Sequence, residues 1–120
     1  MSKLYDLDFL NNISNGDQAF IREMIDSFFE SSQDYINKVN IASDTSDYET
    51  IGKATHKYIP GISFMGMKTL EHDLLFIEEY CKKQTNLDKI PELLSNVKAT
   101  IVNIGEAFKR DFSIEGTIVV

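Results

Sequence analysis

Residues 20–39 read FIREMIDSFFESSQDYINKV, an uninterrupted run in which large apolar residues recur every three or four positions. That spacing places them on one face of an α-helix, with the charged residues on the other face. The preceding Ser14-Asn15-Gly16-Asp17 contains residues that cap helices. The sequence therefore predicts an amphipathic helix from about residue 17 to about residue 40. Its buried side chains are expected to be Phe20, Ile21, Met24, Ile25, Phe28, Tyr35, Ile36 and Val39.

Three further segments repeat this pattern. Ser46-Asp47-Tyr48-Glu49 is typical of a capping box, in which the Ser46 hydroxyl and the Glu49 carboxylate bond reciprocally to backbone N–H groups, and a helix to about Met65 should follow. A third helix is expected to end near residues 82–86. A fourth should begin near Ile90, with Pro91 in its first turn, where a missing N–H costs no hydrogen bond. The three predicted buried stripes are Ile51, Ala54, Thr55, Tyr58 and Ile62; Leu70, Leu74, Ile77 and Cys81; and Ile90, Leu94, Val97, Ile101, Ile104 and Phe108.

These four segments predict an all-α fold. Long amphipathic helices joined by short connections most readily form an up-and-down four-helix bundle. Residues 4–13 are expected to add a short N-terminal helix at one end. Residues 113–120 lack the helical period, so a docked irregular tail and a disordered tail are both open. The chain of 120 residues has no internal repeat or linker and is expected to form one domain.

Composition limits the class of protein. Nineteen Asp and Glu against twelve Lys and Arg give a formal net charge of −7, which argues against nucleic acid as a partner. Cys81 is the only cysteine, so no internal disulfide can form. Acidic residues at positions 6 and 8 and the absence of a long apolar run argue against a signal peptide or a membrane span. A cytoplasmic location without membrane contact is therefore expected.

Motifs for self-contained catalysis are missing from the sequence. Neither His56 nor His72 has a glutamate three residues before it, as a di-iron bundle would require, and no metal site is expected. A glycine-rich phosphate loop is also absent, so no nucleotide site is expected. Cys81 lies on an apolar stripe, where it is interpreted as a buried side chain rather than a nucleophile.

Helical geometry separates the two histidines. At roughly 100° per residue, His56 lies about 140° from the centre of its buried stripe and should face solvent. An accessible imidazole is mostly neutral near pH 7 and therefore nucleophilic. Lys53 and Lys57 lie within one turn and could compensate the charge of a phosphoryl group. His72 is expected among Glu71 and Asp73 as an ordinary surface histidine.

The flank around His56 is predicted to be small or smooth. Gly52, one turn before the histidine, lacks a side chain that could obstruct a partner. Ile59 lies about 80° from the centre of the stripe and should be half covered. The predicted partner-docking residues are Gly52, Ile59, Pro60, Ser63 and Phe64.

The run Ala54-Thr55-His56-Lys57-Tyr58-Ile59-Pro60-Gly61-Ile62-Ser63-Phe64-Met65-Gly66 resembles the histidine-containing phosphotransfer (HPt) domain family. That family carries an Ala-x-His-x-Leu-Lys-Gly run, followed by an apolar-Gly pair ten residues after the histidine. Leu70 and the pair Ile77-Glu78 match the downstream Leu-to-Leu-Glu spacing of the family. Gly16-Asp17, Phe28 and Asp47 also fall in similar places, so the resemblance covers roughly residues 7–81.

The resemblance implies a phosphorelay intermediate that is not a self-contained enzyme. His56 would accept a phosphoryl group on Nε2 from the aspartate of one receiver domain and pass it to another. The implied partners are receiver domains of a hybrid histidine kinase and of a response regulator. The receiver would supply Mg²⁺, so the bundle would need no cofactor of its own.

Two positions depart from the family pattern. Ile59 stands where a lysine is usual, and Pro60 stands where a glycine is usual. The role of steadying the phosphate is therefore carried over to Lys57, and geometry adds Lys53. Pro60 cannot donate to the carbonyl of His56, so a local kink or a bound water is expected.

Two other functions stay open. The same bundle could bind receiver domains or helix surfaces through residues 59–64 without phosphorylation of His56. A metal-dependent enzyme is the weaker alternative.

Overall fold

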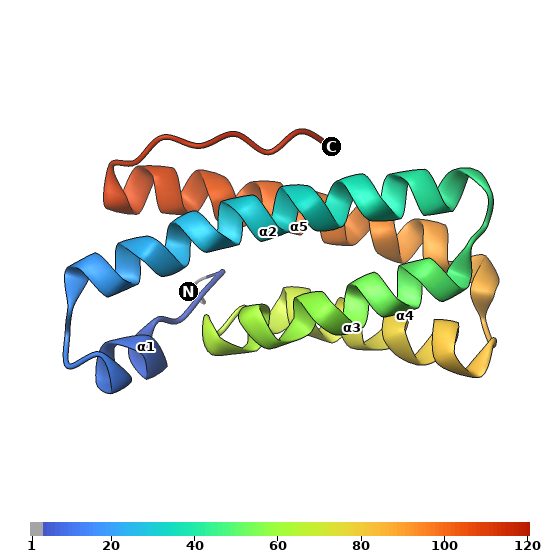
Figure 1. The fold of residues 1–120 in the computed structure, drawn as a ribbon, viewed down its shortest axis with the longest axis horizontal. Helices are drawn as coiled ribbons and strands as arrows, with labels where there is room; N and C mark the ends of the chain where they lie inside the picture. Colours follow the sequence, from blue (N-terminus) through green and yellow to red (C-terminus); the bar gives the residue numbers. More distant parts are fainter. Residues whose placement is uncertain (1–3) are drawn as a thin grey trace.

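The computed structural model describes residues 4–120, and this part of the chain is all-α. The elements are α1 (Asp8–Ile13), α2 (Gln18–Asp44), α3 (Tyr48–Phe64), α4 (Lys68–Lys83), the short 3₁₀ turn η1 (Leu87–Lys89) and α5 (Ile90–Phe112). Successive long helices run in opposite directions along the long axis (Figure 1). The predicted up-and-down bundle with a short N-terminal helix is confirmed. The single domain expected from the sequence includes residues 1–3, which lie outside the described residues.

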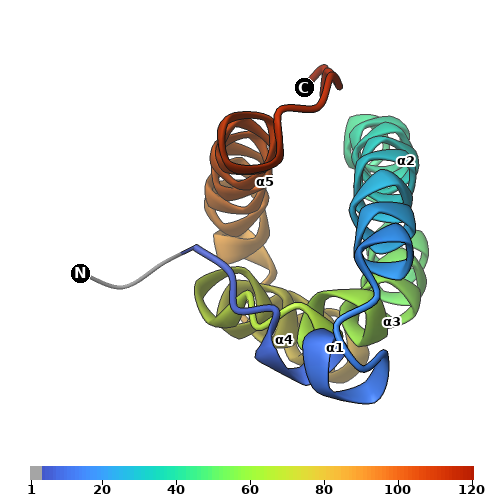
Figure 2. The same cartoon turned by 90° about the vertical axis from the view of Figure 1, so that its left-hand side faces the viewer.

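The core is made by one stripe from each long helix. Every predicted stripe residue of α4 and α5 is buried, and α3 differs only at Ala54, which is half-buried. On α2 the prediction is wrong at Phe20 and Met24, which are half-buried, while Ser32 and Ala42 are buried instead. The reason is that α2 is rotated so that Ile21 points towards the core. Phe20 and Met24 therefore lie at the edge of the buried face. The bundle encloses this core between α2, α3, α4 and α5 (Figure 2).

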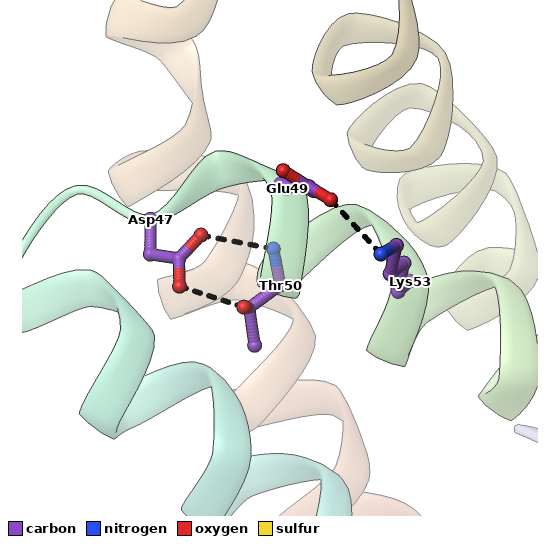
Figure 3. Close-up of polar contacts among 4 residues, drawn as sticks. All are labelled: Asp47, Glu49, Thr50 and Lys53. Carbon is purple, nitrogen blue, oxygen red and sulfur yellow. Dashed lines mark hydrogen bonds and ion pairs between the residues drawn. The ribbon is translucent and has the colours of Figure 1, made fainter.

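Asp47 caps the N-terminus of α3 (Figure 3). Its carboxylate accepts hydrogen bonds from the backbone N–H of Thr50 at 3.1 Å and from the hydroxyl of Thr50 at 2.6 Å. Ser46 lies in the preceding turn with a positive φ of 51°, and Glu49 pairs with Lys53. The predicted capping box between Ser46 and Glu49 is therefore wrong. The cap lies one residue later because the chain enters the helix after the left-handed turn at Ser46.

Two buried tyrosines join α2 to α3. Tyr35 and Tyr58 stack with ring centroids 4.5 Å apart and an interplanar angle of 6°. The Tyr35 hydroxyl lies 2.8 Å from the Thr55 hydroxyl, and the Tyr58 hydroxyl lies 2.5 Å from that of Ser32. Burial raises the pKa of both tyrosines. The two hydrogen bonds set the register of α3 against α2, because a slip would leave buried hydroxyls unpaired.

Residues 4–7 are irregular, so the helix expected from residue 4 begins only at Asp8. The backbone N–H of Asp6 donates to the carbonyl of Met65 at 2.9 Å, and the Tyr5 hydroxyl donates to Asp111 at 2.5 Å. Burial, followed by the hydrogen bond to Asp111, raises the pKa of Tyr5 to about 12. Tertiary contacts with α5 and with the end of α3 therefore hold this segment in place of helical hydrogen bonds.

The last residues also lack helical structure. Ser113 ends α5 with a positive φ of 53°, and residues 114–120 lie extended beside α5 and α2 (Figure 1). Of the two alternatives left open by the sequence, the structure shows the docked irregular tail. Within residues 4–120 no helix combines the length and the apolar character needed to cross a membrane.

Candidate functional site

His56 lies at the middle of α3 and faces the groove between α3 and α4. Its side chain is 82% exposed, and its Nδ1 contacts Oε2 of Glu78 on α4. The Glu78 side chain is only 26% exposed, so the carboxylate has less freedom than one fully in solvent. No group among residues 4–120 hydrogen-bonds to Nε2 of His56. The imidazole is thus held at Nδ1, and its Nε2 is free to react.

This contact selects the tautomer of His56. A carboxylate can only accept a hydrogen bond, so Nδ1 carries the proton that Glu78 receives. In the neutral ring the lone pair is then on Nε2, which faces away from Glu78. The arrangement presents a nucleophilic nitrogen to solvent, with the ring orientation set by a second helix.

The two predicted lysines differ in their surroundings. Lys53 donates to Glu49 at 2.9 Å, and both side chains are more than three-quarters exposed (Figure 3). The hydrogen bond and the charge of Glu49 raise the pKa of Lys53. Lys57 is exposed, and no carboxylate among residues 4–120 lies within ion-pair distance of it. Lys57 therefore offers an uncompensated positive charge next to His56, whereas the charge of Lys53 is partly balanced.

Gly52, which is predicted to belong to the docking surface, also has a packing role between α3 and α4. A Cβ atom at this position would lie 2.9 Å from Cβ of Cys81 on α4. The glycine lets the backbones of α3 and α4 approach closely beneath His56. A larger residue at position 52 should therefore disturb the bundle, because the missing side chain is needed for helix packing.

The other predicted docking residues continue along α3 after His56. Ile59 is half-buried, Pro60 and Ser63 are exposed, and α3 continues through Pro60. The Ser63 hydroxyl donates to the carbonyl of Ile59 at 3.3 Å and contacts the carboxylate of Glu71. Phe64 is 47% exposed. It stacks on Phe9 of α1, with ring centroids 5.6 Å apart.

Sequence reasoning missed several residues of the groove. Glu78, Leu75 and Phe76 line it from α4, and the last two are 47% and 37% exposed. Leu75 and Phe76 could have been found from the sequence, since these two apolar residues lie outside the predicted buried stripe of the same helix. Apolar side chains on the solvent side of a helix often belong to binding surfaces. Glu78 could not be assigned because its partner is on another helix.

The remaining candidates do not form a second reactive centre. The His72 side chain is 69% exposed, with Nδ1 3.4 Å from its neighbour Asp73 and its ring edge against Phe76. Cys81 is buried, and burial raises the pKa of its thiol to about 11. No group of three His, Cys, Asp or Glu side chains within the described residues could hold a metal ion.

Comparisons with protein-family models, with curated proteins and with solved structures found no match. The chemistry of the α3–α4 groove is therefore argued from the residues of this chain.

Proposed function

We propose that this protein is a phosphotransfer module of the HPt type, in which His56 carries a phosphoryl group between receiver domains. The contact between Nδ1 of His56 and Glu78 on a side chain that is 82% exposed carries this proposal. The exposure argues against a histidine that serves only packing, and the carboxylate from a second helix orients the ring with Nε2 free.

The transfer reaction balances with the groups present. Nε2 of His56 attacks the phosphorus of an aspartyl phosphate in line, the N–P bond forms, and the P–O bond to the aspartate breaks. The aspartate leaves as a carboxylate. Because Nδ1 keeps its proton, the imidazole ring becomes positively charged as the bond forms, and the Glu78 carboxylate stabilises that charge. Transfer to a second receiver is the reverse sequence on another aspartate.

The surroundings of His56 suit a partner that brings the remaining catalytic groups. No group of His, Cys, Asp and Glu side chains within residues 4–120 suits a metal ion. In this proposal the receiver domain supplies Mg²⁺ and its own phosphate-binding groups. Lys57 would compensate part of the phosphoryl charge once the partner has left. The exposed side chains of Leu75 and Phe76 offer an apolar surface beside the imidazole.

The test uses a purified receiver domain that has been phosphorylated by a small phosphodonor. The protein should gain the mass of one phosphoryl group, and the label should be labile to acid and stable to alkali. His56→Gln should remove the label and keep the helical signal, because the side chain is outside the core. His72→Gln is the matched control on the neighbouring helix and should be labelled like the natural chain. Labelling of His56→Gln would contradict the proposal.

A second function is favoured by the exposed apolar side chains on α1, α3 and α4. The surface formed by these apolar side chains could bind receiver domains without phosphoryl transfer. In that case the natural chain and His56→Gln would bind a receiver equally and neither would take up phosphate.

A further inference from the structure

The extended C-terminal segment lies on the side of the bundle away from α3 and α4 (Figures 1 and 2). It packs on a set of residues that we name the tail site: Phe29, Gln33 and Asn40 of α2 with Gly105 of α5. These residues have no part in the site around His56. The tail site therefore has a separate role.

The tail site recognises the main chain of the segment. The side-chain amide of Gln33 accepts from the backbone N–H of Val119 at 2.8 Å and donates to its carbonyl at 2.9 Å. Asn40, two turns further along α2, donates to the main-chain oxygen of Val120 at 3.3 Å. The side chains of Val119 and Val120 are 69% and 61% exposed. The end of the segment is thus held as an extended peptide, independently of its side chains.

One side chain of the segment is recognised in an apolar slot. Ile118 is half-buried, and its Cδ1 lies 3.3 Å from the position that a Cβ on Gly105 would occupy. The ring of Phe29 lies 3.2 Å from that same position and 3.0 Å from a Cβ built on Gly116. Two glycines, one in α5 and one in the tail, make room for Phe29 and Ile118. The slot holds an isoleucine that follows a glycine by two residues.

Ser113 is the residue that links the tail to the end of α5. Ser113 has a φ of 53°, a left-handed conformation that is unfavourable for residues other than glycine and asparagine. The fully buried stripe of α5 ends before it, at Phe108. Rotation at Ser113 would relieve this conformation and release the tail, and it would withdraw the half-buried Ile114 and Ile118 from the edge of the core. The contacts in the tail site are the same whichever chain supplies the segment.

We propose that the tail site is a peptide-binding site, filled in this structure by the chain's own residues 114–120, and that the same segment of a second copy can replace them. Reciprocal exchange gives a symmetric dimer, which closes because each copy donates one tail and accepts one. The attached tail competes at a high effective concentration, so exchange should grow with protein concentration towards the millimolar range. This inference does not rest on phosphotransfer by His56.

The experiment measures binding of a fluorescent synthetic peptide, Ser-Ile-Glu-Gly-Thr-Ile-Val-Val, which has the sequence of residues 113–120. Full-length Ile118→Asp cannot fill its own slot and should bind the peptide at least about tenfold more tightly than the natural chain. Adding Gln33→Ala should reverse this gain, and a peptide with aspartate in place of its isoleucine is the negative control. Absence of binding to a folded Ile118→Asp chain would overturn the proposal.

One measurement addresses the second copy directly, and another tests the tail site in the natural chain. Sedimentation of the natural chain should show a dimer fraction that rises with concentration and is lost in Ile118→Asp. Peptide binding without such a dimer would overturn the second copy as the occupant. Hydrogen exchange at the Val119 amide of the natural chain needs no variant. Excess peptide should increase this exchange, and unchanged protection would also overturn the proposal.

Discussion

Nδ1 of His56 on α3 contacts Oε2 of Glu78 on α4, and these two residues are 22 positions apart in the chain. A partly covered carboxylate thereby orients an imidazole that is otherwise open to solvent. Any reaction at Nε2 should therefore depend on a residue that does not touch the phosphoryl group. Glu78 acts as a positioning residue in the proposed function.

Glu78→Ala should slow phosphoryl uptake from a phosphorylated receiver by about tenfold, since a hydrogen bond to a charged group contributes roughly 1.5 kcal/mol or more. Glu78→Gln can still accept from Nδ1 and should lose less. Nitrogen NMR of the His56 ring gives a readout independent of transfer, because the alanine variant should populate both neutral tautomers. Equal rates and an unchanged tautomer in all three proteins would show that Glu78 has no positioning role.

Lys57→Ala should lower the equilibrium fraction of phosphorylated His56 more than Lys53→Ala does, because Lys53 is already paired with Glu49. An exposed charge contributes about 0.2 to 1 kcal/mol, so the change should be at most roughly fivefold. Ile59→Lys should raise the same fraction and weaken receiver affinity. All three effects should shrink at high salt because screening weakens exposed charges. Effects that do not depend on salt would contradict an electrostatic role.

Gly52→Ala should destabilise the bundle by about 1 to 3 kcal/mol, because the new Cβ would lie 2.9 Å from Cβ of Cys81. Gly61→Ala in the same helix is the matched control. No atom lies within 4 Å of a Cβ at Gly61, so alanine there should stabilise by about 0.4 to 1 kcal/mol. Denaturant unfolding of both variants measures the difference. Equal stabilities would mean that α3 and α4 can separate at no cost.

Tyr58→Phe should cost about 1 to 3 kcal/mol of unfolding free energy, because it leaves the buried Ser32 hydroxyl without its partner. The double variant Ser32→Ala with Tyr58→Phe should recover part of that loss, since neither group is then unpaired. Urea unfolding of the two single variants and the double variant measures the coupling free energy between the two substitutions. Strict additivity would rule out the hydrogen bond as a stabilising contact.

Asp47→Ala should lower the melting temperature at neutral pH, whereas Asp47→Asn should retain most of the cap. Hydrogen bonds from Thr50 lower the pKa of Asp47. The charged cap therefore stabilises the fold above the ordinary aspartate pKa of about 3.9, and this contribution is lost as the pH falls through the lower folded value. Thermal melts from pH 7 down to pH 2 should show the gap between the natural chain and Asp47→Ala closing in acid. A difference in melting temperature that does not change with pH would assign the loss of stability to helix propensity.

The helices and their buried faces could be predicted because they depend on local spacing. Stripes such as Leu70, Leu74 and Ile77 repeat with the helical period, and burial of apolar area then selects the bundle. The exposure of His56 follows from the same geometry, since its angle from the stripe is independent of what packs on the other side. Helix ends were less predictable, because Ser46 and Asp47 are both good caps and only the turn before α3 selects between them.

The contacts between helices could not be predicted from spacing. That Gly52 faces Cys81, and that Glu78 meets His56, depends on the rotation and register of α4 against α3, which the packing of the whole core sets. The docking of the tail has the same origin, because Gln33 of α2 and Gly105 of α5 can contact one segment only when the two helices pack together. Sequence by itself determined most of the inward-facing residues and the exposure of both histidines. Tertiary structure decided which side chains meet, because packing energy depends on contacts between residues that are distant in the chain.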